Sequence, residues 1–293
     1  MNEIIIVNKP KGITSRDVVN KISKILNIKK VGHNGTLDPL ATGVLVITTN
    51  RYTKLNNLLS SREKEYIAEV KIGIETDTLD ITGNIIEKKE EHLDINKLEE
   101  TLKKYKKTYM QEVPKYSAVK VNGKKLYEYA REGIEVTLPK KEVTIKEIEL
   151  ISYKKDSFIF KTTVSKGTYI RSLIRDILKD MNVIGTMNNL TRTKQGIFNI
   201  ENSNTLEDIE KGNYSSLKIK DILNISVITA DNNLKFKIIN GAKLKGKYSD
   251  EVLFIDKEEN ELAIYKKEKD ELKMEINLIS NITGLTKEEI QKL

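Results

Sequence analysis

A carboxylate on a glycine-rich loop is the strongest candidate for chemistry in this chain. Asp38 lies inside the run Gly-His-Asn-Gly-Thr-Leu-Asp-Pro-Leu-Ala-Thr-Gly at 32–43. Pro39 disfavours the helical region for Asp38, so we expect an extended backbone there. The apolar segment 44–47 predicts a buried strand, which would give the loop a rigid base. Tight turns and the close approach of another chain are permitted at the glycines of the run, Gly32, Gly35 and Gly43.

This pattern alone leaves two interpretations of Asp38. Its carboxylate could cap backbone N–H groups of an Asp-Pro turn, which is common, or it could do chemistry. The chain has 2 histidines and no cysteine, which excludes a zinc site built from these residues and zinc-dependent base deamination with it. The chain also lacks a Gly-x-x-x-x-Gly-Lys-Ser/Thr motif, so nothing supports nucleotide hydrolysis.

The net charge of +8 favours a polyanionic partner. The basic excess lies in residues 1–223, whereas 224–293 is close to neutral. A lysine-rich proteome would give the same excess, so charge alone does not establish nucleic-acid binding. Candidate phosphate contacts are the lysine-rich segments 103–107, 115–125 and 140–146.

The location of the protein is suggested by what the sequence lacks. Without cysteines, nothing implies an oxidising compartment. The N-terminus shows no signal-peptide pattern, and no apolar stretch is long enough to cross a bilayer. We therefore expect a cytoplasmic protein with no membrane contact.

Mixed helices and strands are expected to position the loop. Apolar spacing predicts helices over 15–26, 52–59 and 95–105. A further helix is expected to open at Gly167, with this apolar face: Ile170, Leu173, Ile174, Ile177, Leu178 and Met181. Strands are predicted at 44–49, 66–74, 143–151 and 158–164. Because these elements show no regular βαβ rhythm, the sequence predicts an α+β fold.

The second half of the chain suggests a division into two domains. The polar stretch 199–216 is the best boundary region, and 252–255 and 262–265 resemble strands. We expect a first domain at 1–223, with a mixed, largely antiparallel sheet and flanking helices. A small β-rich module would follow at 224–293.

The run at 32–43 closely resembles the signature of the bacterial tRNA pseudouridine-55 synthases, the TruB family. The family pattern Gly-His-x-Gly-Thr-Leu-Asp-Pro-x-Ala-x-Gly is complete at its fixed positions, with Asn34 where bacterial members commonly have Thr. Further segments resemble family motifs and occur in the family's order: 8–15, 76–83, 116–123, 126–131 and 165–173. The segment 189–198 matches less well. Thr191 stands there in place of the first of two arginines, which suggests one phosphate contact fewer.

The resemblance implies the pseudouridine synthase fold with a C-terminal PUA-like RNA-binding module. It also implies isomerisation of uridine to pseudouridine at position 55 in the T loop of tRNA, by base flipping, without cofactor or metal. Asp38 would be the essential catalytic residue. It could attack C1′, attack C6 or remove the 2′ proton, and all three routes need an ionised carboxylate with a cation nearby. The partner would be the tRNA T stem-loop, bound by a monomer.

The same resemblance assigns roles to other residues. Arg171 would be the cation paired with Asp38, although an arginine at this position could equally bind phosphate or solvent. Tyr66 would stack on the target base, although a strand tyrosine is often a core residue. Tyr169 would lie in the uridine pocket, although its spacing also permits a half-buried helix tyrosine. His33 would position RNA without acid–base work. Residues expected to support the loop are Lys9, Pro10, Gly35 and Thr36.

Two alternatives remain open from the sequence. One is a guide-RNA-dependent pseudouridine synthase, against which the short chain and the bacterial motif details argue. The other is an RNA-binding protein that helps tRNA to fold without catalysis. The retention of all the candidate site residues argues against this second alternative.

Overall fold

The computed structural model describes residues 2–60 and 63–279. A nine-stranded sheet runs in the order β1-β3-β12-β4-β11-β10-β7, with β2 paired to β3 and β13 to β12. β12 pairs with β3 in parallel, while the other pairings are antiparallel. The fold is therefore α+β with a mixed, largely antiparallel sheet, as predicted. The strands are β1 (Ile4–Lys9), β2 (Val31–Asn34), β3 (Thr42–Thr49), β4 (Lys64–Ile72), β7 (Thr108–Glu112), β10 (Lys140–Lys154), β11 (Ser157–Val164), β12 (Gly185–Gln195) and β13 (Phe198–Asn199).

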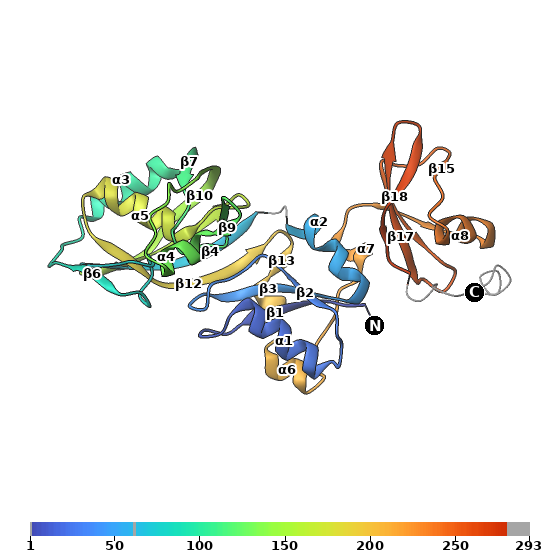
Figure 1. Cartoon of the computed structure of the whole chain (residues 1–293), viewed down its shortest axis with the longest axis horizontal. Helices are drawn as coiled ribbons and strands as arrows, with labels where there is room; N and C mark the ends of the chain where they lie inside the picture. Colours follow the sequence, from blue (N-terminus) through green and yellow to red (C-terminus); the bar gives the residue numbers. More distant parts are fainter. Residues whose placement is uncertain (1, 61–62, 280–293) are drawn as a thin grey trace.

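Two helices cover one face of this sheet and pack against each other, α3 (Ile95–Tyr105) and α5 (Ile170–Met181) (Figure 1). Side chains of β4 fill the space under these helices, because every second residue of the strand is buried. Its inward residues include Ala68 and Val70, which join the core that also holds Leu173 and Ile177 of α5. The inward side chains of the strand and the apolar stripe of the helix thus pack in one core.

Helix α1 (Ser15–Ile25) follows β1 and begins at a capping box formed by Thr14 and Asp17. This cap satisfies backbone N–H groups that the first helical turn leaves without partners. α1 lies next to α6 (Leu206–Glu210) at the edge of the sheet formed by β1 (Figure 1). The two helices close the end of the sheet at which the glycine-rich loop begins.

Two predicted helices differ in detail from the structure. The segment expected as a helix over 52–59 is a 3₁₀ helix, η1 (Asn50–Leu55), continued by α2 (Asn56–Ser60). The helix expected to open at Gly167 begins at Ile170, because Tyr169 has an extended backbone. Gly167 instead has φ +89°, a turn conformation suited to glycine.

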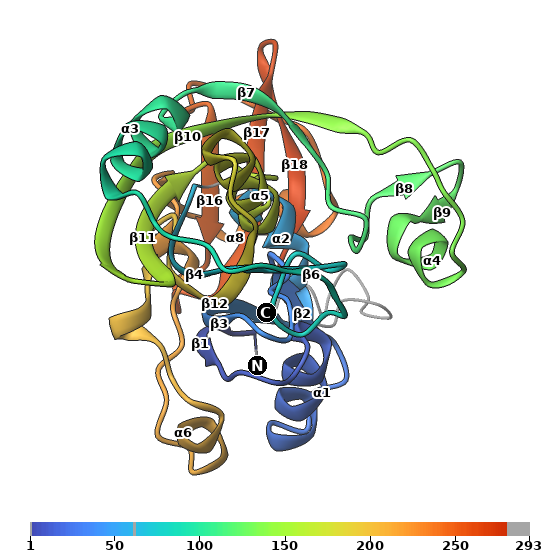
Figure 2. The same ribbon diagram turned by 90° about the vertical axis from the view of Figure 1, so that its left-hand side faces the viewer.

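Residues 113–139, which we call the arm, project from the main body (Figure 2). It contains the short strands β8 (Lys120–Val121) and β9 (Lys124–Lys125), followed by α4 (Leu126–Arg131). The chain turns at Asn122 and Gly123 between β8 and β9, and both residues have positive φ. A second small hairpin, β5 (Ile74–Thr76) with β6 (Ile85–Lys88), lies between β4 and α3 in the chain.

The C-terminal module is a separate, curled five-stranded sheet that forms a β half-barrel (Figure 1). Its strand order is β14-β16-β17-β18-β15. These strands are β14 (Ser226–Thr229), β15 (Leu244–Lys245), β16 (Glu251–Ile255), β17 (Glu261–Glu268) and β18 (Glu271–Asn277), accompanied by α8 (Asn232–Ile239). The β-rich character predicted for this region is confirmed.

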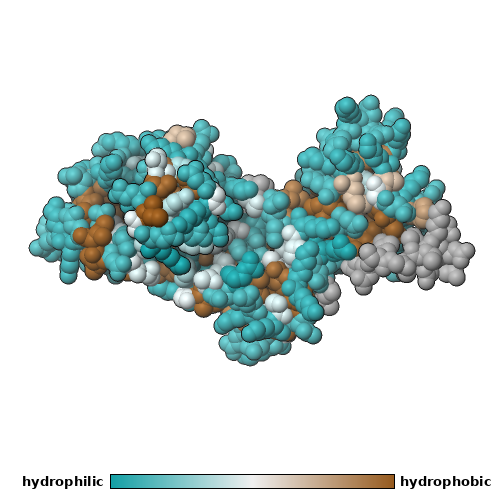
Figure 3. All heavy atoms as spheres, in the orientation of Figure 1, coloured by the Kyte–Doolittle hydropathy of each residue, from teal (hydrophilic) through white to brown (hydrophobic). Residues whose placement is uncertain are grey.

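The two sheets share an apolar core at their junction. Leu253 and Ile264 of the module belong to the same buried cluster as Val44 and Val46 of β3. Apolar surface also gathers at the base of the module on the face drawn in Figure 3. Between the sheets, the chain passes through η2 (Ile200–Asn202), α6 and α7 (Ile219–Ile222). In this stretch Asn204 and Leu217 form isolated β-bridges to residues of β1. The division at residue 223 stays a prediction. None of the helices in 2–60 and 63–279 is both long and apolar enough to span a membrane.

Candidate active site

An ion pair joins the glycine-rich loop to the start of α5. An Nη2 of Arg171 lies 2.9 Å from Oδ2 of Asp38. The two side chains differ in exposure, 6% for Arg171 and 39% for Asp38. The arginine is thus fixed inside the protein, while the carboxylate that it holds remains open to a ligand. The structure therefore brings together the two residues that the resemblance pairs.

The guanidinium of Arg171 is held by two further backbone groups. Nη1 donates to the carbonyl of Thr78 at 3.0 Å, and Nη2 donates to the carbonyl of Tyr116 at 3.0 Å. Both carbonyls lie in segments that resemble family motifs, 76–83 and 116–123. A planar guanidinium has several donors in fixed directions, so these acceptors set the direction from which Arg171 meets Asp38.

The loop beside Asp38 is held by residues of α1 and of the turn that precedes it. The hydroxyl of Ser15 donates to the carbonyl of Leu37 at 3.0 Å and accepts the N–H of Leu37 at 2.9 Å. On the other side of Asp38, the carbonyl of Pro39 accepts the N–H of Gly12 at 2.8 Å. Both chain neighbours of Asp38 are therefore fixed by hydrogen bonds, which is how a reactive group is kept in one geometry.

Lys9, which the resemblance assigns to the support of this loop, donates hydrogen bonds to three carbonyls around it. It is fully buried, and its Nζ donates to the carbonyls of Pro10 and Ile13 at 2.9 and 2.7 Å and to that of Pro39 at 3.4 Å. Burial lowers the pKa of Lys9 to about 8, although the charge of Asp38 acts in the opposite direction. Pro10 contributes its carbonyl, and Thr36 is exposed on the loop.

Arg192 fixes the first half of the loop from β12. It is fully buried, and it donates to the carbonyls of Val44 at 2.7 Å and of Gly35 at 2.8 Å. Gly43 permits this approach, since its φ is +98° and a Cβ there would lie 2.2 Å from the carbonyl oxygen of Arg192. The arginine that remains in the poorly matching segment is therefore a structural support, and the hydroxyl of Thr191 beside it pairs with that of Thr42 at 2.9 Å.

Asn34, the departure from the bacterial pattern, has both polar groups of its side chain bonded. Nδ2 donates to the carbonyl of Asn56 at 2.9 Å, and Oδ1 accepts from Nε2 of Gln195 at 3.1 Å. Next to it, Nδ1 of His33 is buried without a hydrogen-bond partner among the described residues. Burial, followed by the charges of Arg16 and Arg192, lowers the pKa of His33 below its usual value.

The two candidate tyrosines occupy different positions. Tyr66 is 6% exposed, belongs to the main core cluster and lies opposite Arg192 in the pairing of β4 with β12. Tyr169 directly precedes α5, close enough to Arg171 and Asp38 for their charges to act on its phenol, while burial raises its pKa. The roles assigned to both, in stacking and in the uridine pocket, stay predictions.

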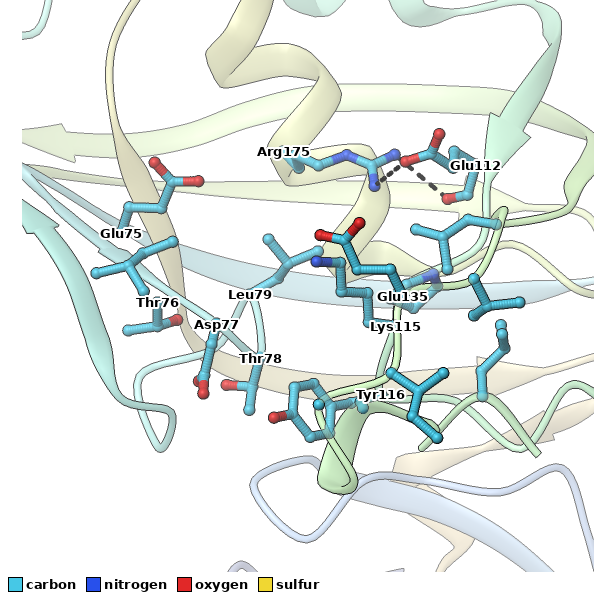
Figure 4. Close-up of a pocket in the computed structure, with 18 of the residues that line it drawn as sticks. Glu75, Thr76, Asp77, Thr78, Leu79, Glu112, Lys115, Tyr116, Glu135 and Arg175 are labelled. Carbon is cyan, nitrogen blue, oxygen red and sulfur yellow. Dashed lines mark hydrogen bonds and ion pairs between the residues drawn. The ribbon is translucent and has the colours of Figure 1, made fainter. Parts of the chain in front are cut away.

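A pocket of about 830 Å³ lies behind this centre, between the arm and the β5–β6 hairpin (Figure 4). It shares Thr78 and Tyr116 with the anchor of Arg171. Its lining includes the carboxylates of Glu75, Asp77, Glu112 and Glu135. The lining also includes the cations of Lys115 and Arg175, and Arg175 pairs with Glu112 at 3.1 Å.

Several residues that hold the site together could not be predicted from the sequence. Ser15 and Arg192 were parts of motifs, but their role in bracing the loop had no signal in the sequence. The roles of Thr78 and Tyr116 could not be predicted from side-chain chemistry, because these residues bind Arg171 through their backbone carbonyls. The motif order was the signal that these distant segments share one site.

The chain is similar to known proteins over most of its length. The sequence profile of the TruB family pseudouridylate synthase N-terminal domain matches residues 23–170. The chain is 44% identical over 245 residues to a tRNA pseudouridine synthase B of Caldanaerobacter subterraneus subsp. tengcongensis, covering 83% of this chain and 86% of that protein. It is 40% identical over 282 residues to a tRNA pseudouridine synthase B of Caldicellulosiruptor saccharolyticus, covering 93% and 97%.

The fold is also similar to a solved structure of an H/ACA RNP bound to a substrate RNA containing 2′-deoxyuridine. The TM-score is 0.67 at 22% sequence identity, and the match covers 95% of this chain and 85% of that one. At this identity the likeness concerns the fold. It includes both the mixed sheet and the C-terminal half-barrel.

Proposed function

Since the chain belongs to the TruB family of pseudouridylate synthases, we propose that it converts uridine to pseudouridine at position 55 in the T loop of tRNA, with Asp38 as the essential carboxylate. The protein is an enzyme, an isomerase of the tRNA pseudouridine synthase B type. The reaction breaks the glycosidic bond, turns the detached base and rejoins it through C5. It needs neither a redox change nor an energy source, so the proposal includes no cofactor.

The observation that carries the proposal is the exposed carboxylate of Asp38 at 2.9 Å from the buried guanidinium of Arg171. Attack at C1′, attack at C6 and removal of the 2′ proton all require this carboxylate in its ionised form at the nucleotide. Arg171 orients the carboxylate and offsets its charge, and the hydrogen bonds to Leu37 and Pro39 keep the loop in place. Such preorganisation lowers the barrier without any rearrangement during the reaction.

A uridine in a folded loop must leave its stack before Asp38 can reach its sugar. The arm offers cations for the surrounding backbone, including Lys115, Lys120 and Lys125, whereas Lys124 pairs with Glu132. Two of its rings also lie beside cations, with Lys124 Nζ 5.0 Å from the centre of Tyr129 and Arg131 5.4 Å from that of Tyr127. Basic and aromatic groups together suit RNA, and we propose that the arm contacts the T stem-loop.

The remaining roles follow from the same proposal. Tyr66 would stack on the flipped base, Tyr169 would line its pocket and His33 would position the RNA around it. The module at 224–293 would add a near-neutral, PUA-like contact to tRNA. The protein would act as a monomer.

The proposal is tested by tritium release from a tRNA transcript made with 5-tritiated uridine. Rejoining through C5 must expel one tritium for each uridine converted. We expect one tritium per tRNA, and none when uridine 55 of the transcript is replaced by cytidine. Failure of the protein to release tritium from bare transcript that it binds would contradict the proposal, and it would leave a guide-dependent enzyme or an RNA-folding protein.

A further inference from the structure

A buried glutamine connects the end of β7 to the start of α5. Gln111 is 1% exposed. Its Oε1 accepts the backbone N–H of Tyr169 at 2.8 Å, and its Nε2 donates to the hydroxyl of Tyr109 at 2.9 Å. No side chain caps the N-terminus of α5 from Tyr169 itself. Gln111 therefore supplies, from another strand, the partner that fixes where this helix begins.

The contacts continue along α5 from the same short segment of β7. The hydroxyl of Tyr109 donates to Oδ2 of Asp176 at 3.1 Å, and the hydroxyl of Ser172 donates to the carbonyl of Glu112 at 2.8 Å. Arg175 pairs with Asp176 at 2.8 Å and with Oε1 of Glu112 at 3.1 Å. Figure 4 shows the contact of Arg175 with Glu112 at the wall of the pocket. The first two turns of α5 are thus held to β7 at several points.

The start of α5 carries both Tyr169 and Arg171. Arg171 must reach Asp38 while it also donates to the carbonyls of Thr78 and Tyr116. A small shift of the helix would disturb all three contacts together. The link from Gln111 therefore acts on the geometry of the ion pair through Tyr169.

We propose that Gln111 is a positioning residue for the reaction: its amide fixes the start of α5 so that Tyr169 and Arg171 face Asp38. This inference rests on the proposed function, since it concerns the same site. Gln111 does not touch the substrate. Its effect passes through the backbone of Tyr169.

The site requires an amide because of the direction of its hydrogen bonds. The N–H of Tyr169 needs an acceptor. The hydroxyl of Tyr109 has already given its proton to Asp176, so its oxygen needs a donor. Glutamine provides both groups. A carboxylate of the same shape provides only acceptors, and it would compete with Asp176 for a single phenolic proton.

The variant Gln111→Glu turns this requirement into a pH signature. Burial raises the pKa of Asp176 above its usual value. A second buried carboxyl beside it would raise the proton affinity of the pair further. When the pair takes up a proton as the pH falls, the missing donor returns. Other titratable or charged groups near this position are Tyr105 of α3 with its partner Asp180 of α5, Tyr109 and Glu112 of β7, Arg175 of α5, and Lys141, which lies opposite Gln111 on β10.

The experiment compares single-turnover tritium release at saturating enzyme for the wild type, Gln111→Glu and Gln111→Met between about pH 5.5 and pH 8. We expect both variants to be about 10- to 100-fold slower than the wild type at the upper end. Towards the lower end, Gln111→Glu should recover most of this loss, and Gln111→Met should recover none. The dissociation constant for tRNA should change little, because the arm is untouched.

Met110→Glu is the matched control, since it adds a carboxylate to the adjacent position of β7, where the side chain is 56% exposed. It should follow the wild type at every pH. The proposal is overturned if the ratio of Gln111→Glu to wild type is constant with pH, or if Gln111→Met reacts at the wild-type rate. Should Gln111→Met fail to fold, the Gln111→Glu profile alone decides. An inactive wild type would instead contradict the proposed function, so the two failures are distinguishable.

Discussion

Two buried cations that brace the active-site loop and two exposed cations of the C-terminal module are held in opposite ways. Lys9 and Arg192 are fully buried, and they donate to backbone carbonyls. Lys273 of the module is 56% exposed and pairs with Glu268 at 3.3 Å. Lys266 is equally exposed and pairs with Glu251 at 3.2 Å. The first group is bound by neutral acceptors, whereas the second is matched by carboxylates.

This difference shows where the positive charge of the protein is available. A carbonyl that accepts from Lys9 or Arg192 fixes the position of the cation but does not cancel its charge. In the module, a nearby carboxylate cancels it, and exposed pairs of this kind add little to stability. Burying a cation without a full counter-charge is unfavourable, and the fold tolerates it at the loop that presents Asp38. We therefore expect substitutions at the site to cost much more than those in the module.

After Asp38 itself, the largest effect is expected for Arg171. Arg171→Met removes the partner of Asp38, and it leaves the carbonyls of Thr78 and Tyr116 without their donor. Loss of such a group should slow single-turnover tritium release by about 10²- to 10³-fold. Arg171→Lys should recover little of this, because an ammonium cannot reproduce the directions of a planar guanidinium. Lys179→Met, at an exposed position of α5, is the control and should leave the rate unchanged.

A smaller effect is expected for Ser15, which fixes the loop without any charge. Ser15→Ala removes both hydrogen bonds to Leu37, which should lower the free energy of unfolding by about 1–2 kcal/mol. The rate should fall about 10-fold because the loop loosens. Ser23→Ala removes one hydrogen bond at the other end of α1, to the carbonyl of Ile28. Denaturant titration should show a loss of stability for both variants, and a slower reaction for Ser23→Ala would contradict this account.

A pH effect is expected from Lys9, whose pKa is lowered to about 8, chiefly by burial. Above this value the folded state binds fewer protons than the unfolded state, in which the lysine titrates at its ordinary, higher pKa. The free energy of unfolding should therefore rise with pH between the two values. Lys9→Met should show a shallower rise than the wild type when unfolding is measured from about pH 8 to pH 10. Parallel curves would show that burial of Lys9 carries no such penalty.

The smallest effect is expected in the module. Lys273→Met breaks an exposed ion pair, and the free energy of unfolding should stay within about 0.5 kcal/mol of the wild type. The rate of tritium release should also be unchanged. A loss comparable with that of Ser15→Ala would remove the contrast between the two regions.

The sequence predicted the elements of the fold better than their arrangement. The alternation along β4 and the apolar stripe of α5 come from local periodicity, so both elements could be predicted from the sequence. The parallel pairing of β12 with β3 could not be predicted in this way, because it depends on the close approach of Arg192 to Gly43. That contact joins residues far apart in the chain.

The candidate site shows the same limit. Asp38 and Arg171 were predicted as a pair from the resemblance, and the structure places them in contact. Nothing in the sequence pointed to Gln111, since a lone glutamine on a strand has no pattern. Its partners lie on β7 and at the start of α5, which are far apart in the sequence and adjacent only in the folded protein. Similarly, Asn34 was seen as a departure from the family pattern, and its pairing with Gln195 explains how the fold accommodates it.

The most direct test of the central claim is single-turnover tritium release by Asp38→Asn. Asparagine keeps the size of the side chain and its position on the loop, but it removes the ionised carboxylate. We expect the variant to bind tRNA like the wild type and to react slower by a factor on the order of 10⁴ or more. A rate within about 10-fold of the wild type would contradict the assignment of the chemistry to this carboxylate.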